Sequence, residues 1–327
     1  MTPEPHSLDR GSAKPETSAV QLKSVRQVFR RRMDRLAETA IFGVSFAVIS
    51  IILLIFVYVA REAWPLIVGT ASGVTLRSML GVPFEWQPVS VDPRFSVIPL
   101  VVGTFKVTLV AMTIAAPLAI AAALYTAEFA PRRLREWLKP TIELLAGIPS
   151  VVIGFFVFIV LASWLSETFG LRFRLNGLTA GIGLSLAVIP VIYTVAEDAL
   201  SAVPREFREA SLALGASRTQ TAVRVVLPSA SPGIGAAMIL GFGRAIGETM
   251  IVLMVSGNAA LMSLDPLTPT RTLAATVAAE LGEVVFGSDH YRALFFIGTL
   301  LFLITTVLNG IGDRVNRGLR RKLFGAL

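Results

Sequence analysis

Long apolar runs separated by short polar segments dominate the chain. A helix needs about 20 mostly apolar residues to cross the hydrocarbon core of a bilayer. Six segments meet this requirement, at about residues 40–60, 99–125, 144–165, 177–197, 232–257 and 292–312. The apolar run at residues 272–279 would form a helix only about 12 Å long and cannot span. The pattern therefore predicts an all-α polytopic integral membrane protein with about six transmembrane helices.

The polar ends of the chain predict its domain organisation. Residues 1–35 contain three prolines and several Ser and Thr, so we expect a disordered tail there. The first apolar run starts too far from the amino terminus for a standard signal peptide, and we expect it to persist as a transmembrane helix over residues 36–62. The other spans and their loops form the predicted core, residues 97–314, and residues 315–327 form a basic tail.

The composition is typical of a membrane protein and excludes several kinds of catalytic and metal-binding site. Hydrophobic residues make up 54% of the chain and charged residues only 16%, against about a quarter in soluble proteins. There is no cysteine, which excludes disulfides, thiolate metal sites and cysteine nucleophiles. The only histidines are His6 and His290, too few for a multi-histidine metal site unless carboxylates supply further ligands.

The net charge of +8 is better explained by a lipid bilayer than by nucleic acid. Neither a recognisable nucleic-acid-binding motif nor a set of interleaved aromatic residues accompanies the basic residues. With the amino terminus placed in the cytoplasm, about three basic residues lie in inside segments for each one outside, as the positive-inside rule requires. An even number of spans then places both termini in the cytoplasm.

Two basic residues, Lys106 and Arg244, remain inside predicted spans. Arg244 is near the middle of the fifth span and should face a cavity or a partner, and Glu248 follows at i,i+4, where the two charges can pair. The pair is either a purely structural bridge or a site where an anion exchanges with the carboxylate, since the guanidinium matches phosphate oxygens well. Lys106 lies near the outer end of its span, where it either snorkels or contributes to a substrate path.

The cytoplasmic segment at residues 204–228 has the pattern of two short helices joined by a turn. Residues 207, 210, 211 and 214 form a stripe with helical spacing that we expect to be buried, and Gly215 ends the first helix. Ser217 and Gln220 have the spacing of a capping box for the second helix. Such a unit either docks into the groove of a partner or packs on its own helix bundle.

This segment closely resembles the EAA loop of the permeases of bacterial ABC importers, with Ser for the second Ala and Val for the usual Ile. The matching positions are Glu209, Ala210, Ser211, Gly215, Val225, Leu227 and Pro228. The resemblance implies a type I (MetI-like) ABC-importer permease fold. It also implies that Glu209, Ala210, Gly215, Leu227 and Pro228 couple this chain to an ATP-hydrolysing subunit.

The sequence contains no phosphate-binding loop of the G-x-x-x-x-G-K-[ST] type. We therefore expect ATP and Mg to bind a partner ATPase and this chain to carry neither a cofactor nor catalytic residues.

A second resemblance concerns residues 243–250, Gly-Arg-Ala-Ile-Gly-Glu-Thr-Met, which are similar to the signature of phosphate-specific (Pst) permeases. The Thr-Met ending looks like the PstC subunit rather than the PstA subunit. With further similar segments, the resemblance covers about residues 60–315. It implies that Arg244 and Glu248 act in phosphate passage in a bacterial plasma (inner) membrane. The implied partners are a PstA-like permease, PstB-like ATPase subunits and a PstS-like extracytoplasmic phosphate-binding protein.

Other functions remain open on the residues alone. Another oxyanion such as sulfate or molybdate would suit the same arginine. A secondary transporter or channel would use the same spans without ATP, although such folds often contain internal repeats and none is evident here. An intramembrane enzyme would need a nucleophile with a base or a metal within the spans, which His290 alone does not supply.

Overall fold

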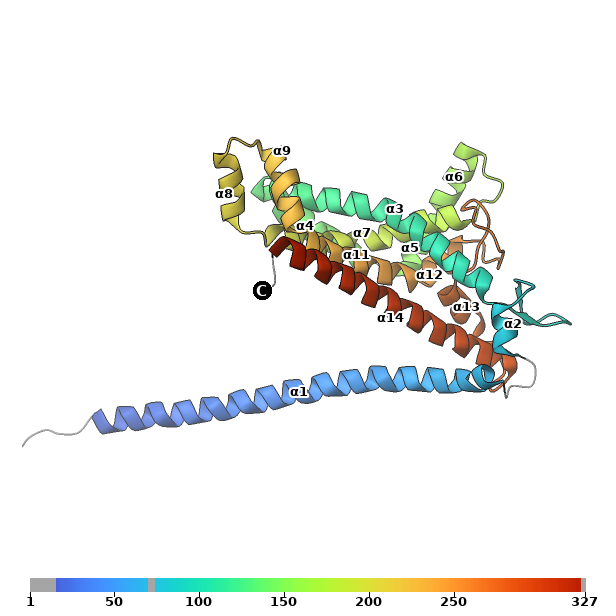
Figure 1. The fold of residues 1–327 in the computed structure, drawn as a ribbon, viewed down its shortest axis with the longest axis horizontal. Helices are drawn as coiled ribbons and strands as arrows, with labels where there is room; N and C mark the ends of the chain where they lie inside the picture. Colours follow the sequence, from blue (N-terminus) through green and yellow to red (C-terminus); the bar gives the residue numbers. More distant parts are fainter. Residues whose placement is uncertain (1–15, 70–73, 325–327) are drawn as a thin grey trace, which may run out of the picture. The chain divides into compact units, whose positions relative to one another are not determined.

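The computed structural model describes residues 16–69 and 74–324, most of which are helical (Figure 1). By its internal contacts the chain divides into two units, Met1–Tyr58 and Val59–Leu327. The first unit consists of the helix α1 (Glu16–Val68) as far as Tyr58. Its large apolar side chains between residues 41 and 55 are exposed in the isolated chain, as expected for a helix surrounded by lipid.

The start of α1 differs from the expected disordered tail. Residues 16–35 are helical, while residues 1–15 lie outside the described part of the chain. Between Glu16 and Gly43 the sequence contains no glycine or proline and is rich in Gln, Lys, Arg and Leu, which favour helix. The apolar span, Ala37–Val68, is therefore the continuation of a longer helix.

The second unit is built around two long helices, α3 (Ile98–Glu128) and α7 (Gly177–Ser201), which contact each other more extensively than any other pair of elements. Small residues on α3 make this packing possible, since Ala111, Ala115 and Ala119 are completely buried one turn apart. Gly181 on α7 lies so close to Val110 that a Cβ there would overlap it. The helix α11 (Ser231–Ile246) packs against α3, α7 and the last helix, α14 (Asp289–Phe324).

The third span begins later than the sequence predicts. An amphipathic helix, α4 (Arg132–Ala146), comes first, and Pro149 caps the start of the span. The span consists of α5 (Ser150–Phe156), the π-helical turn η1 (Val157–Leu161) and α6 (Ala162–Phe169). Proline at 149 disfavours helical geometry at the residue before it, which separates α4 from α5.

The fifth predicted span, residues 232–257, is not one continuous helix, and this part of the prediction is wrong. The helix α11 ends at Ile246, and a second short helix, α12 (Met250–Val255), begins after a break of three residues. Gly247 caps α11 at the break, where its low helix propensity favours an end. Glu248 therefore lies between two helices instead of within one.

A second group of buried residues occupies the end of the unit opposite α8 and α9 (Figure 1). It is formed by α2 (Leu76–Leu80), the two-residue strands β1 (Trp86–Gln87) and β2 (Arg94–Phe95), the short helix α13 (Leu273–Glu280) and the first turns of α3 and α14. The strands pair antiparallel, with Trp86 opposite Phe95. The end of α1 joins this group through Ala63 and Leu66, both completely buried.

Five helical segments of the described chain are long and apolar enough to cross a membrane. A sixth is added if α11 and the helical segment before it, Arg218–Ser229, are counted as one span bent by 67°. The predicted all-α polytopic fold with about six spans is confirmed. The core predicted to end at residue 314 and the basic tail after it are continuous, since α14 extends to Phe324.

Candidate functional site

The structure brings Arg244 and Glu248 together as the i,i+4 spacing predicts. Arg244 is in the last turn of α11 and Glu248 in the break before α12, with Arg244 Nη2 3.5 Å from Glu248 Oε2. This separation exceeds the 2.7–2.9 Å of a strong charge-assisted hydrogen bond. The other oxygen, Glu248 Oε1, accepts a long hydrogen bond of 3.5 Å from the backbone N–H of Ile251. The pair is close but loosely held.

The two partners differ sharply in exposure. The side chain of Glu248 is 4% exposed, whereas that of Arg244 is 45% exposed although it lies on an apolar helix. Leu240, one turn before Arg244 on α11, is also exposed. An arginine that faced lipid at this depth would be costly, at about 2.5–3.5 kcal/mol on insertion scales. The exposed side of Arg244 therefore belongs against water or another chain.

Lys106 has a different environment and forms its hydrogen bonds with residues other than Arg244 and Glu248. Its side chain is 7% exposed, and Nζ donates to the backbone oxygens of Ser263 and Asp265, at 3.1 and 3.2 Å. A third bond, of 3.3 Å, goes to Thr268 Oγ1. An ammonium group has three donors, so these bonds use all of them. Lys106 holds the loop between α12 and α13 and does not snorkel outward.

The segment at residues 204–228, called the coupling segment below, has the predicted helix, turn and helix. Its first helix is α8 (Arg205–Ala213), and Gly215 follows with φ +85°. Ser217 and Gln220 form the complete capping box of α9 (Arg218–Thr221). A π-helical turn, η2 (Ala222–Val226), and α10 (Leu227–Ser229) complete the segment, and Figure 1 shows α8 and α9 projecting beyond the ends of the core helices.

The stripe on α8 that we expected to be buried is not buried, and this expectation is wrong. Phe207 and Leu214 are exposed, and no residue of α8 is buried. The stripe instead lines an open groove of about 460 Å³ between α8 and the helices that follow it. The groove residues are Phe207, Ala210, Ser211, Leu214, Ala216, Gln220, Arg224 and Val225. The apolar side chains of α8 are thus available to a partner.

The other predicted coupling residues are distributed over this segment. Glu209 and Ala210 are exposed on α8, and Gly215 forms the turn. Leu227 is half-buried and Pro228 is exposed at the start of α10.

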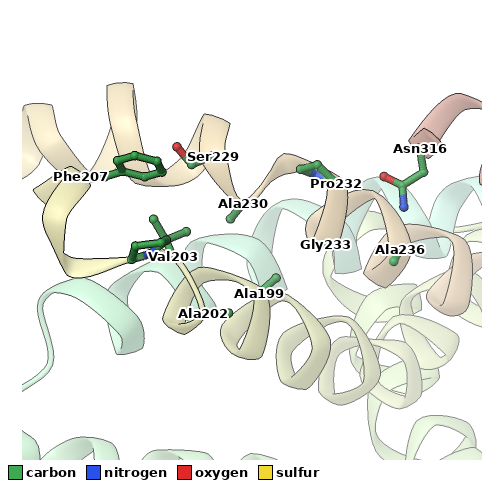
Figure 2. Close-up of a pocket in the computed structure, with 11 residues that line it drawn as sticks. Ala199, Ala202, Val203, Phe207, Ser229, Ala230, Pro232, Gly233, Ala236 and Asn316 are labelled. Atoms are coloured by element: carbon green, nitrogen blue, oxygen red, sulfur yellow. The ribbon is translucent and has the colours of Figure 1, made fainter. Parts of the chain in front are cut away.

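A cavity of about 520 Å³ lies where the coupling segment joins the core. Figure 2 shows Phe207 and Ser229 on one side of it, Ala199 of α7 and its capping residue Ala202 below, and Asn316 of α14 beyond Pro232. The lining is largely apolar. Asn316 Oδ1 is buried and has no hydrogen-bond partner among the described residues. The cavity lies beside the 67° bend between α10 and α11.

Sequence reasoning missed a buried charge cluster near the same end of the core. Glu197 on α7 is completely buried and binds two basic residues of α4, Arg135 Nη2 at 2.5 Å and Lys139 Nζ at 2.7 Å. Hydrogen bonds from Lys139 to Asp198 and to Glu197 raise the pKa of Lys139 above its ordinary value. The matched i,i+4 spacing of the two bases is the signal in the sequence, since it places both on one face of α4.

A second cluster that the sequence did not reveal surrounds Glu280 at the end of α13. Its carboxylate accepts from Trp86 Nε1 at 3.1 Å and contacts Arg271 Nη1 at 2.5 Å and His290 Nε2 at 2.8 Å. These contacts join the paired strands β1 and β2, α13 and the start of α14. No group of three or more metal-binding side chains was found in the described part of the chain.

Comparison with known proteins identifies the family to which this architecture belongs. Residues 115–321 match the family described as "Binding-protein-dependent transport system inner membrane component". A solved structure titled as an inward-facing MetNI methionine ABC transporter has a TM-score of 0.51 and 20% identity, covering 68% of this chain and 94% of that chain. At this level of identity the likeness shows the fold alone.

Relatives in sequence are more similar. The probable ABC transporter permease protein YqgH of Bacillus subtilis (strain 168) is 38% identical over 226 residues, 68% of this chain and 72% of that protein. The phosphate transport system permease protein PstC of Xylella fastidiosa (strain Temecula1) is 34% identical over 241 residues, 68% and 73% of the two chains. PstC of Haemophilus influenzae is 30% identical over 279 residues, 78% and 86%. The chain therefore belongs to the family of binding-protein-dependent transport system inner membrane components, as a PstC-like multi-pass permease subunit.

Proposed function

We propose that this chain is a membrane permease subunit of an ATP-driven importer of inorganic phosphate. The observation that carries the proposal is the half-exposed guanidinium of Arg244 within an apolar helix. Glu248 contacts one of its nitrogens at 3.5 Å, so most of the five N–H donors remain free to bind a tetrahedral oxyanion. The PstC relatives support phosphate as that anion.

The exposed face of Arg244 requires a second wall for the translocation path. A PstA-like permease subunit supplies it in this proposal, so that the anion passes between two chains and out of contact with lipid. Glu248 neutralises Arg244 when no anion is present. Because the contact between them is long, replacing the carboxylate by the anion costs little free energy. Lys106 contributes to the same path indirectly, because its hydrogen bonds fix the loop between α12 and α13.

The coupling segment transmits the energy of ATP hydrolysis from PstB-like ATPase subunits. Its exposed apolar groove, together with Glu209 and the Gly215 turn, offers the surface on which such a subunit docks. ATP and Mg bind the ATPase, and this chain makes and breaks no bond. A PstS-like binding protein delivers phosphate at the extracytoplasmic side, and both termini of the chain are cytoplasmic.

The test is reconstitution of the chain with its PstA-like, PstB-like and PstS-like partners in proteoliposomes. We expect ATP-dependent uptake of radiolabelled phosphate that excess sulfate or molybdate does not inhibit. Uptake of sulfate or molybdate in preference to phosphate would assign a different oxyanion. Uptake driven by an ion gradient without ATP would assign a secondary transporter instead.

A further inference from the structure

Arg208 lies on α8, and its side chain reaches the end of α3. Its Nη2 and Nε donate to Glu128 Oε1 at 2.7 and 3.1 Å, and Nε also lies 3.3 Å from Glu128 Oε2. Both side chains are mostly buried, with 21% and 12% of their surface exposed. Two nitrogens on one carboxylate give a fixed geometry as well as a charge interaction.

The same guanidinium binds the end of α7. Nη2 donates to the backbone oxygen of Leu200 at 3.0 Å, and Nη1 donates to that of Val203, two residues after the helix, at 2.5 Å. The last carbonyls of a helix have no partner within the helix, and a cation placed there also interacts favourably with the helix dipole. One side chain of the coupling segment thus joins the ends of α3 and α7, the two central helices of the core.

No other side chain of α8 within the described residues forms a hydrogen bond or ion pair with α3 or α7. The cavity of about 520 Å³ lies between the two connections of the coupling segment to the core, because Ala199 and Phe207 line it from the α7–α8 side and Ser229 and Pro232 line it from the α10–α11 side (Figure 2). The α10–α11 connection contains a 67° bend. The two connections therefore differ, since a side chain of α8 is bonded to the core on the α7–α8 side and the chain is bent beside unfilled space on the α10–α11 side.

We propose that Arg208 is the positioning residue that transmits movement of the coupling segment to α3 and α7. A force applied to α8 reaches α3 through this guanidinium, and it reaches α7 through the same group and through the short backbone connection at residues 202–204. The bend at α10–α11, next to unfilled space, accommodates the displacement. This inference rests on the proposed function, because it takes the ATPase as the source of the movement.

The test is a double-mutant cycle in proteoliposomes that hold the complete complex. The variants are Arg208→Gln, Glu128→Gln and the two together, and the measurement is ATP hydrolysed per radiolabelled phosphate imported. Each single variant should raise this ratio about tenfold, within the range of couplings found in one hydrogen-bond network. The double variant should raise it no further than Arg208→Gln alone, since that change already removes the bonds to Glu128 together with those to Leu200 and Val203.

Arg132→Gln is the matched control, because Arg132 forms an exposed ion pair with Glu136 on another cytoplasmic helix. It should leave the ratio unchanged, and Arg208→Lys should restore part of the coupling. An unchanged ratio in both single variants, or effects that multiply in the double variant, would overturn the inference. If Arg208→Gln does not assemble, the ratio in Glu128→Gln decides, because Glu128 lies outside the coupling segment. A wild-type complex that imports no phosphate would instead refute the proposed function.

Discussion

At the scale of single residues, the charge of Arg244 and the backbone conformation of Gly215 determine the proposed substrate path and the proposed coupling. Arg244 carries a charge on an apolar helix, and exposing its side chain to lipid would be costly unless water, an anion or another chain contacts it. Gly215 has φ +85°, a conformation that side chains other than glycine rarely adopt. The role of each residue can therefore be tested by replacing a single side chain.

Replacing Arg244 by Lys keeps the charge but replaces the planar fork by a single ammonium group. We expect phosphate uptake to fall about tenfold or more while the complex still assembles, because bidentate contact with the oxyanion is lost. The matched control is Arg317→Lys, which changes an exposed pair with Asp313 on α14. Uptake equal to the wild type in Arg244→Lys would show that the guanidinium fork does not bind the anion.

Replacing Gly215 by Val tests the turn between α8 and α9. No atom lies within 4 Å of the position of an added Cβ, so the strain comes only from the backbone and is about 1–2 kcal/mol. The variant should insert in the membrane but lose uptake and co-purification of the ATPase. Gly215→Asn should be tolerated better, since Asn adopts positive φ more readily. Gly282→Val, at another open position with ordinary φ, is the control. Retention of ATPase binding and uptake by Gly215→Val would argue against a coupling role.

At the scale of elements, breaks in helices place the functional groups. The sequence pattern predicts one helix over residues 232–257, but the break at residues 247–249 moves Glu248 out of the helix, where it lies 3.5 Å from Arg244. Period and hydrophobicity do not reveal such a break, because the residues around it are as apolar as those of a continuous span. The capping box and the Gly215 turn were predictable, since both depend on local backbone chemistry.

The attachment of α4 to α7 gives a prediction at the same scale. Lys139→Met should lower the free energy of unfolding by about 1–3 kcal/mol, because it removes a hydrogen-bonded charge from the buried Glu197. The folded-state pKa of Lys139 is raised, so its contribution is complete below the unfolded value of 10.5 and is lost as the pH rises further. Thermal unfolding of the purified protein should show a constant difference from the wild type between about pH 7 and 10.

Arg132→Met is the control for this measurement, because its pair with Glu136 is exposed to solvent. No difference between Lys139→Met and this control would show that Lys139 does not help to hold α4 against Glu197.

At the scale of the whole molecule, the distribution of basic residues predicts the orientation of the chain in the membrane. The number of spans and the all-α class were predictable because apolar length and basic flanks are properties of the sequence alone. The contacts of Glu197, Arg208 and Glu280 were not, since their partners are distant in the sequence. The expected burial of the α8 stripe was wrong because the stripe lines an open groove instead of packing on the core.

The orientation predicts the result of reporter fusions. Fusions after Pro140 and after Gln220 should report the cytoplasm, and a fusion near Trp86 should report the outside. An outside signal after Gln220 would contradict both the topology and the coupling role of residues 204–228.

The charge-swapped variant Arg244→Glu with Glu248→Arg tests the central claim most directly, by phosphate uptake in proteoliposomes measured together with assembly of the complex. The swap keeps two opposite charges next to each other, so a purely structural pair should preserve both assembly and uptake. If Arg244 meets the passing anion, the swap places a carboxylate in a poorly solvated path, and repulsion between like charges should abolish uptake while assembly persists. The account predicts an assembled complex without phosphate uptake. Uptake at the wild-type rate would contradict it.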